Sequence, residues 1–133
     1  MIDARMAPYA ALVLRVALGA MFIAHSLYLK LVVFTLPGTV KFFESLGLPG
    51  VAAHATIAVE ALGGIMLILG VKTRYAAVAL VPVLLGATWV HWKNGWLFTN
   101  AGGGWEYPLF LAAATVAQAL IGNGAYALRA NLR

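Results

Sequence analysis

Two histidines, an acid and a tyrosine stand near the ends of the apolar stretches of this chain, and these residue types can bind a redox ligand. His25 and Ser26 fall in the first stretch, His91 in the third, and Glu106-Tyr107 begins the last. Imidazole can hydrogen-bond a quinone carbonyl or bind a metal, a carboxylate can accept a proton, and nearby aromatic rings can stack on a quinone. We therefore take His25, His91, Glu106 and Tyr107 as a candidate quinone or metal site. The alternative is that they are ordinary polar residues at a membrane boundary.

A second group of polar residues falls within the apolar stretches themselves. Arg15, Glu60 and Gln118 interrupt the first, second and last stretches. At about 1.5 Å per residue, they lie roughly 10, 15 and 16 Å from the same end of the bundle, close enough to meet. An ionisable group at such a depth needs a partner. We expect a buried Arg15–Glu60–Gln118 network, which serves as a clamp between helices or, alternatively, handles protons or a substrate.

The elements that carry these residues are predicted to be membrane helices. Hydrophobic residues make up 63% of the 133 residues and charged residues 10%, with a mean hydropathy of +0.91, which is typical of an integral membrane protein. About 20 apolar residues suffice to cross the hydrocarbon core. We expect an all-α membrane protein with a single domain, a bundle of four transmembrane helices over about 9–29, 51–70, 76–92 and 107–128. A short interfacial helix over 40–46, capped by Thr39, is predicted in the first outer loop.

The second of these helices is predicted to face the interior of the bundle. Its small and polar residues recur at helical spacing and share one face, where neighbouring backbones can approach closely: Ala53, Thr56, Glu60, Gly63, Gly64 and Leu67. The glycine run 102–104 is not a phosphate loop, because it lacks the Lys-Ser/Thr pair, and we expect a tight turn beneath Trp105 instead.

The distribution of charge predicts the orientation in the membrane. Four spans place one set of basic residues on one side, namely Arg5, Lys72, Arg74, Arg129 and Arg133. The other side has Lys30, Lys41 and Lys93, diluted by Glu44 and Glu106. The positive-inside rule then places both termini in the cytoplasm. No basic cluster interleaved with aromatics indicates nucleic-acid binding, and the absence of cysteine means that redox chemistry needs histidines, aromatics or a bound cofactor.

Several short motifs, in their order along the four spans, resemble the DoxX family of small bacterial and archaeal membrane proteins. They are Arg15, His25-Ser26 with Lys30, Gly47-Leu48-Pro49, Glu60 with Gly63-Gly64, Leu69-Gly70 with Thr73-Arg74, and 103–108. The resemblance implies a four-helix bundle in a prokaryotic inner membrane, associated with a terminal quinol oxidase or a thiosulfate:quinone oxidoreductase. It also marks Arg15, His25, Glu60, His91 and Glu106 as the positions to test. The family's His-Gly with a closely following Lys appears here as His25-Ser26 with Lys30 displaced.

Three hypotheses for function follow from these patterns. The first is a redox-linked subunit that binds quinol, or supports a partner that does, at the outer end of the bundle. The second is a structural or assembly subunit without catalysis, which docks onto other membrane subunits or self-associates. The third, a proton or small-solute pathway, rests on Glu60 alone. In each case the lipid bilayer is the surrounding medium.

Overall fold

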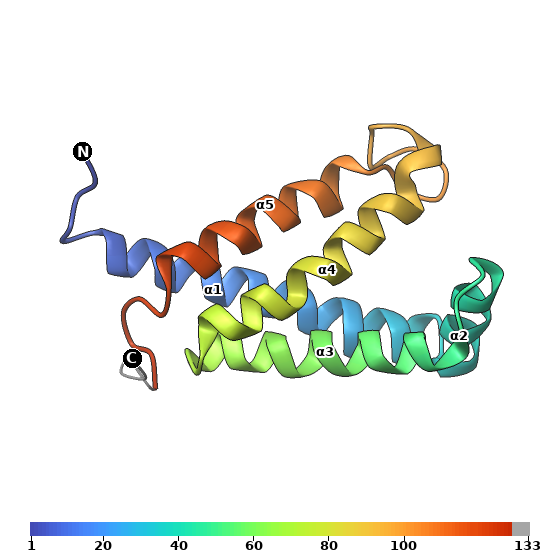
Figure 1. Ribbon diagram of the computed structural model, residues 1–133, viewed down its shortest axis with the longest axis horizontal. Coiled ribbons are helices and arrows are strands. Elements are labelled where there is room, and N and C mark those ends of the chain that lie inside the picture. The colour runs from blue at the N-terminus through green and yellow to red at the C-terminus, as the bar shows by residue number, and fades with distance from the viewer. Residues whose placement is uncertain (129–133) are drawn as a thin grey trace.

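The computed structural model describes residues 1–128, and it confirms an all-helical membrane protein. Helix α1 (Ala7–Ile23) continues into a π-helical stretch, η1 (Ala24–Val33), and is followed by α2 (Leu36–Ser45) and α3 (Gly50–Leu69). Helix α4 (Thr73–His91) ends in a short 3₁₀ turn, η2 (Trp92–Asn94), and α5 is Glu106–Ile121. In Figure 1, α1 and α3 form one pair and α4 and α5 another. The N-terminus and the end of α5 lie at one end of the bundle, and the loop between α4 and α5 lies at the other (Figure 1).

Three helical stretches are long and apolar enough to cross a membrane, namely Ala7–Val33, Gly50–Leu69 and Thr73–Asn94. The fourth predicted span is shorter than expected, since α5 has 16 residues and ends at Ile121 instead of Leu128. At 1.5 Å per residue α5 is about 24 Å long, less than the roughly 30 Å of a hydrocarbon core. The helix ends there because Gly122 takes a φ of 89°, which a helix cannot continue.

The segment after α5 folds back onto the other helices instead of extending away from them. The Ala125 N–H donates to Pro8 O at the start of α1, and the Leu128 N–H donates to Leu69 O at the end of α3. Non-helical backbone near membrane depth must find partners within the protein. The segment 122–128 therefore completes the bundle end that α5 is too short to reach. Arg129 and Arg133, which the charge argument used, lie outside the described residues.

Glycines set the distance between α1, α3 and α4. A Cβ on Gly64 would lie 2.9 Å from Gly19 O, and one on Gly19 would lie 2.6 Å from Gly64 O, so α1 and α3 touch backbone to backbone. A Cβ on the adjacent Gly63 would lie 2.8 Å from Leu80 Cδ1 of α4. Small residues at such contacts are the usual way for membrane helices to pack closely. The predicted inward face of α3 is confirmed, because five of its six residues are buried: Ala53, Glu60, Gly63, Gly64 and Leu67.

The short helix of the first loop is present, but it begins earlier than predicted and has another cap. Thr35 is its N-cap, with its Oγ1 accepting from the Gly38 N–H. Thr39, predicted as the cap, is buried inside the helix and donates from Oγ1 to Lys30 O at 2.8 Å. This bond ties α2 to η1. The hydroxyl is drawn away from the helix end because Lys30 O, in the irregular end of η1, needs a donor.

Candidate functional site

Glu60 is paired with Lys30 near the middle of α3. The Lys30 Nζ lies 2.7 Å from Glu60 Oε2, and the two side chains are 18% and 7% exposed. Lys30 Nζ also donates to His25 O at 3.3 Å. A buried carboxylate is costly without a cation and hydrogen-bond donors, and Lys30 supplies both. The pair thus fixes η1 against α3.

The expected Arg15–Glu60–Gln118 network is not formed, although all three residues are buried as predicted. The Arg15 guanidinium donates to four backbone carbonyls instead: Leu67 O and Ile68 O at the end of α3, and Asn123 O and Ala125 O after α5. The last carbonyls of a helix have no partner within it and carry the negative end of its dipole. Arg15 therefore takes its partners from these carbonyls and not from an acid.

Gln118 also hydrogen-bonds the backbone at the end of α5. Its Nε2 donates to Gly122 O at 2.6 Å, where the helix has just ended. Its Oε1 is buried and has no hydrogen-bond partner within the described part of the chain. Arg15 and Gln118 thus both satisfy backbone around residues 122–125, whereas Glu60 pairs with Lys30 and belongs to a separate cluster.

The π-helical geometry of η1 positions the residues of that cluster. A π-helix bonds residue i to i+5, as in the Phe34 N–H to Leu29 O bond of 2.8 Å. Lys30 stands five residues after His25, so its side chain reaches His25 O while it pairs with Glu60. The displacement of Lys30 from the family pattern therefore does not separate it from His25. Short π-helical stretches occur frequently at functional sites.

His25 and Tyr107 are the two predicted site residues that the structure brings together. Their ring centroids lie 6.3 Å apart with an angle of 30° between the planes, which joins η1 to the start of α5. His25 Nδ1 lies 2.8 Å from Met21 O, and the Tyr107 hydroxyl lies 3.4 Å from the Met21 sulfur. Lys30 links His25 to Glu60, since its ammonium donates both to His25 O and to the Glu60 carboxylate. The cluster His25, Lys30, Glu60 and Tyr107 is the candidate site.

His91 and Glu106, the other two predicted site residues, take part in the loop between α4 and α5. His91 Nδ1 lies 2.7 Å from Ala87 O, and its ring lies beside Gly103. Glu106 Oε1 accepts from the Phe98 N–H at 3.0 Å, which closes the loop. These contacts hold the α4–α5 loop, and a ligand role for His91 and Glu106 stays a prediction.

The same loop is held together by three tryptophans. Trp105 stacks on Trp92 with ring centroids 4.7 Å apart and meets Trp96 edge-on at 4.6 Å. Gly104 is buried, and a Cβ there would lie 2.2 Å from Leu97 O, so only glycine fits. The Gly103 N–H donates to Asn100 O at 2.8 Å, so the run 102–104 lies in a tight turn as predicted, packed closely against the backbone of Trp96 and Leu97.

The residues of the candidate site suit a quinone better than a metal ion. Within residues 1–128, no three His, Asp or Glu side chains lie close enough together to hold a metal ion. A quinone needs less, namely an aromatic surface and a hydrogen-bond partner, and His25 with Tyr107 offers both. The quinone alternative is the one developed below.

The DoxX family model matches residues 10–92, which is more than half of the chain. The chain belongs to the DoxX family. The matched range of this DoxX protein contains Arg15, His25, Lys30, Glu60 and His91, whereas Glu106 and Tyr107 follow it.

One curated relative has a name that refers to redox chemistry. The DoxX chain is 37% identical over 76 residues to a Bacillus subtilis (strain 168) protein named "Putative oxidoreductase CatD", which covers 57% of this chain and 54% of the relative. The chain therefore spans about half the length of the curated relative that it matches. No solved structure matches it.

Lys30 is the site residue that sequence reasoning missed as a partner. It was assigned to the outer boundary, because a lysine after an apolar run usually marks the end of a span. The available signal was its length, since a lysine can reach back along an apolar helix toward a buried acid. The five-residue spacing from His25 carries meaning only once the stretch is known to be π-helical.

Proposed function

We propose that this DoxX protein is a membrane subunit linked to quinone redox chemistry, which binds a quinol or quinone beside the paired rings of His25 and Tyr107. The observation that carries the proposal is the pairing of these two rings beside the Lys30–Glu60 ion pair. It joins an aromatic surface, an imidazole and a carboxylate at one place. The name of the curated relative, an oxidoreductase, supports redox chemistry in general.

The hydrogen bond of His25 indicates what its ring offers to such a ligand. The Nδ1 atom faces Met21 O, an acceptor only, so Nδ1 carries the proton and donates. Neutral imidazole then has its lone pair on Nε2, which accepts a hydrogen bond. A hydroquinone hydroxyl is a suitable donor, and the Tyr107 ring supplies a face on which the ligand ring can stack.

Quinol oxidation releases two protons and two electrons, and the His25 imidazole of this chain can accept a proton. In the proposed step His25 Nε2 accepts the proton of the hydroxyl that it binds, and the proton of the second hydroxyl leaves to water at the membrane boundary. The two electrons pass to a redox-active partner subunit. The function is therefore that of a quinol-binding subunit of a larger membrane complex.

The test compares two histidines that have the same local hydrogen bond. His54 Nδ1 lies 3.1 Å from Gly50 O, as His25 Nδ1 faces Met21 O, but His54 is exposed and lies outside the cluster. Binding of a short-chain quinone is measured by tryptophan fluorescence quenching with the purified chain in mild detergent. We expect His25→Ala to weaken binding by about tenfold or more, the cost of one lost hydrogen bond and ring contact, and His54→Ala to bind as wild type does. Equal affinity in the two variants would refute the site.

A structural or assembly role is the second candidate, and the outer aromatic residues favour it. Trp89, Trp92, Trp96 and Phe98 are each more than half exposed. Aromatic residues are enriched in protein interfaces, so this surface suits docking onto other membrane subunits. Purification from native membranes in mild detergent, followed by partner identification and absorption spectroscopy, separates the two candidates. A stable complex without quinone or chromophore would favour assembly.

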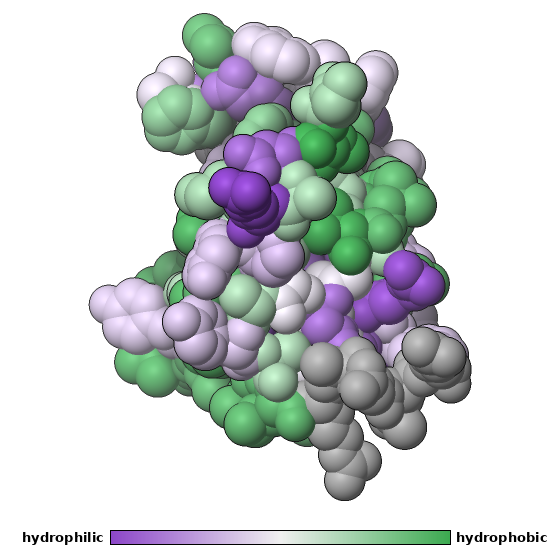
Figure 2. Space-filling view, turned by 90° about the vertical axis from the view of Figure 1, so that its left-hand side faces the viewer, coloured by the Kyte–Doolittle hydropathy of each residue, from purple (hydrophilic) through white to green (hydrophobic). Residues whose placement is uncertain are grey.

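We also propose that the chain lies in a prokaryotic inner membrane with both termini in the cytoplasm. Arg5, Lys72 and Arg74 are exposed. Figure 2 looks at the end of the bundle that carries the N-terminus, where hydrophilic side chains gather between hydrophobic ones. Basic residues on one side of a membrane protein favour the cytoplasm for that side.

A further inference from the structure

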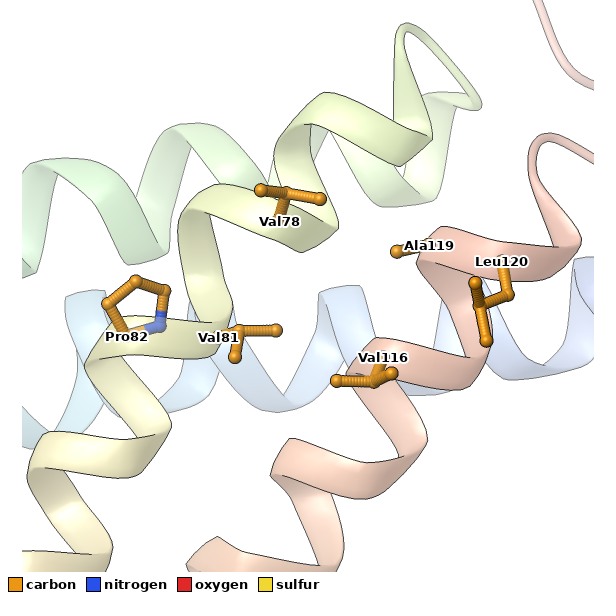
Figure 3. Close-up of a pocket in the computed structure, with 6 residues that line it drawn as sticks. All are labelled: Val78, Val81, Pro82, Val116, Ala119 and Leu120. Carbon is orange, nitrogen blue, oxygen red and sulfur yellow. The ribbon is translucent and has the colours of Figure 1, made fainter.

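An apolar groove lies between α4 and α5, away from the candidate site. It has a volume of about 440 Å³ and is lined by Val78, Val81 and Pro82 of α4 and by Val116, Ala119 and Leu120 of α5. Figure 3 shows these side chains on the two facing helices. Val78, Val116 and Leu120 are 58%, 44% and 76% exposed, so the groove is open to the surroundings of the bundle. Its lining is suited to a hydrocarbon chain.

One end of this groove carries a cation. Arg74 stands four residues before Val78 and eight before Pro82, so all three share one face of α4. Arg74 Nε donates to Ala119 O, a groove residue, at 2.9 Å, which fixes the guanidinium across the end of the groove. Arg74 remains exposed beyond this bond, and its terminal nitrogens can still donate.

No acidic side chain in the described part of the chain pairs with the charge at this end of the groove. Among residues 1–128 the only ion pair is Lys30–Glu60, so no carboxylate neutralises Arg74. Lys72, also exposed, adds a second positive charge just before α4. The first turn of α4 lies beside the last turn of α5, so the opposite ends of the two helix dipoles offset each other, and the positive charge comes from Arg74 and Lys72. An anion is therefore favoured here, next to a surface that favours an acyl chain.

We propose that this groove binds an anionic phospholipid, whose phosphate contacts Arg74 and whose acyl chain lies against Val78, Pro82 and Val116. A phospholipid joins these two chemistries at the right places, because its phosphate lies at the membrane boundary and its chain runs along the helices. Arginine is well suited to phosphate, since its planar group donates two parallel hydrogen bonds. The proposal is independent of the quinone site.

The experiment measures lipid affinity of the purified full chain in detergent by native mass spectrometry, with phosphatidylglycerol and phosphatidylcholine as probes. Wild type should bind phosphatidylglycerol more tightly. Arg74→Gln should lower that affinity by about tenfold and remove the preference, because it removes one charge-assisted phosphate contact. Lys93→Gln is the matched control, since Lys93 is an exposed cation in η2 at the other end of the bundle, and it should bind as wild type does.

A second variant tests the apolar part while Arg74 is kept. Val116→Trp fills the groove at a surface position and should weaken binding of both lipids. Equal phosphatidylglycerol affinity in wild type and Arg74→Gln would overturn the proposal, as would an equal loss in Lys93→Gln. Competition by glycerol phosphate as effective as that by the intact lipid would show a simple anion site and would also overturn it.

Discussion

The Lys30 Nζ atom lies 2.7 Å from Glu60 Oε2, and this ion pair joins the π-helical end of the first membrane helix to the middle of α3. Both side chains are largely withdrawn from solvent. The attraction between the two charges offsets the free-energy cost of removing each of them from water. We therefore expect the stability of the bundle to be sensitive to substitution of either residue.

Substitution of Glu60 should show this sensitivity directly. Glu60→Ala leaves the Lys30 ammonium without its carboxylate, and we expect a loss of about 3 kcal/mol in the free energy of unfolding. Glu60→Gln keeps an oxygen that accepts from Lys30, so the loss should be smaller. Thermal and denaturant unfolding in detergent micelles measures both, with Glu44→Ala, an exposed acid on α2, as the control. An alanine variant as stable as wild type would show that the pair contributes nothing.

Arg15 should control the segment that follows α5. Arg15→Lys keeps the positive charge, but one ammonium cannot reach four carbonyls on two chain segments as the guanidinium does. We expect residues 122–128 to detach, seen as faster amide hydrogen exchange and earlier proteolysis after α5. The conservative Arg5→Lys change, at an exposed position, should alter neither. Unchanged exchange in Arg15→Lys would mean that the remaining hydrogen bonds of the segment, those to Gln118, Thr73, Pro8 and Leu69, hold it without the guanidinium.

The backbone contact between α1 and α3 leaves no room for even a single added methyl group, so adding one should destabilise the bundle. Gly64→Ala places a Cβ 2.9 Å from both Gly19 O and Ile23 Cγ1, so the helices must move apart. Gly86→Ala is the matched control, because a Cβ there meets nothing within 4 Å. We expect Gly64→Ala to lower the melting temperature and Gly86→Ala to leave it unchanged or raise it, since alanine favours helix over glycine by up to about 1 kcal/mol. Equal melting of the two variants would contradict close packing.

The orientation of the protein can be read with single cysteines, because the native chain has none. Lys72 and Ala101 are exposed at opposite ends of the bundle, in the α3–α4 turn and the α4–α5 loop. In intact cells an impermeant thiol reagent should label Ala101→Cys and leave Lys72→Cys unlabelled until the membrane is opened. The reverse pattern would place both termini outside.

Local patterns were enough to predict the helices and their inward face. Hydropathy and helical periodicity act over neighbouring residues, so the apolar runs and the face with Gly63 and Gly64 could be recognised without a fold. The end of α5 was harder, since apolar residues continue to Leu128, and only the conformation of Gly122 ends the helix. The sequence placed His25 and Tyr107 at the same outer end of the bundle, but it did not predict that their rings are in contact.

The sequence by itself determined that Glu60 needs a partner, but the tertiary structure decided which one. Counting residues along each helix placed Arg15 and Glu60 at similar depths in the membrane, but it did not fix how α1 is aligned against α3. Gly19 meets Gly64, and the helices run in opposite directions, so Arg15 lies against Ile68 while Ile23 lies near Gly64. A shift of α1 by one turn would have changed every one of these neighbours. Lys30 then reaches Glu60 because the register set by two glycines leaves Arg15 at the other end of α3.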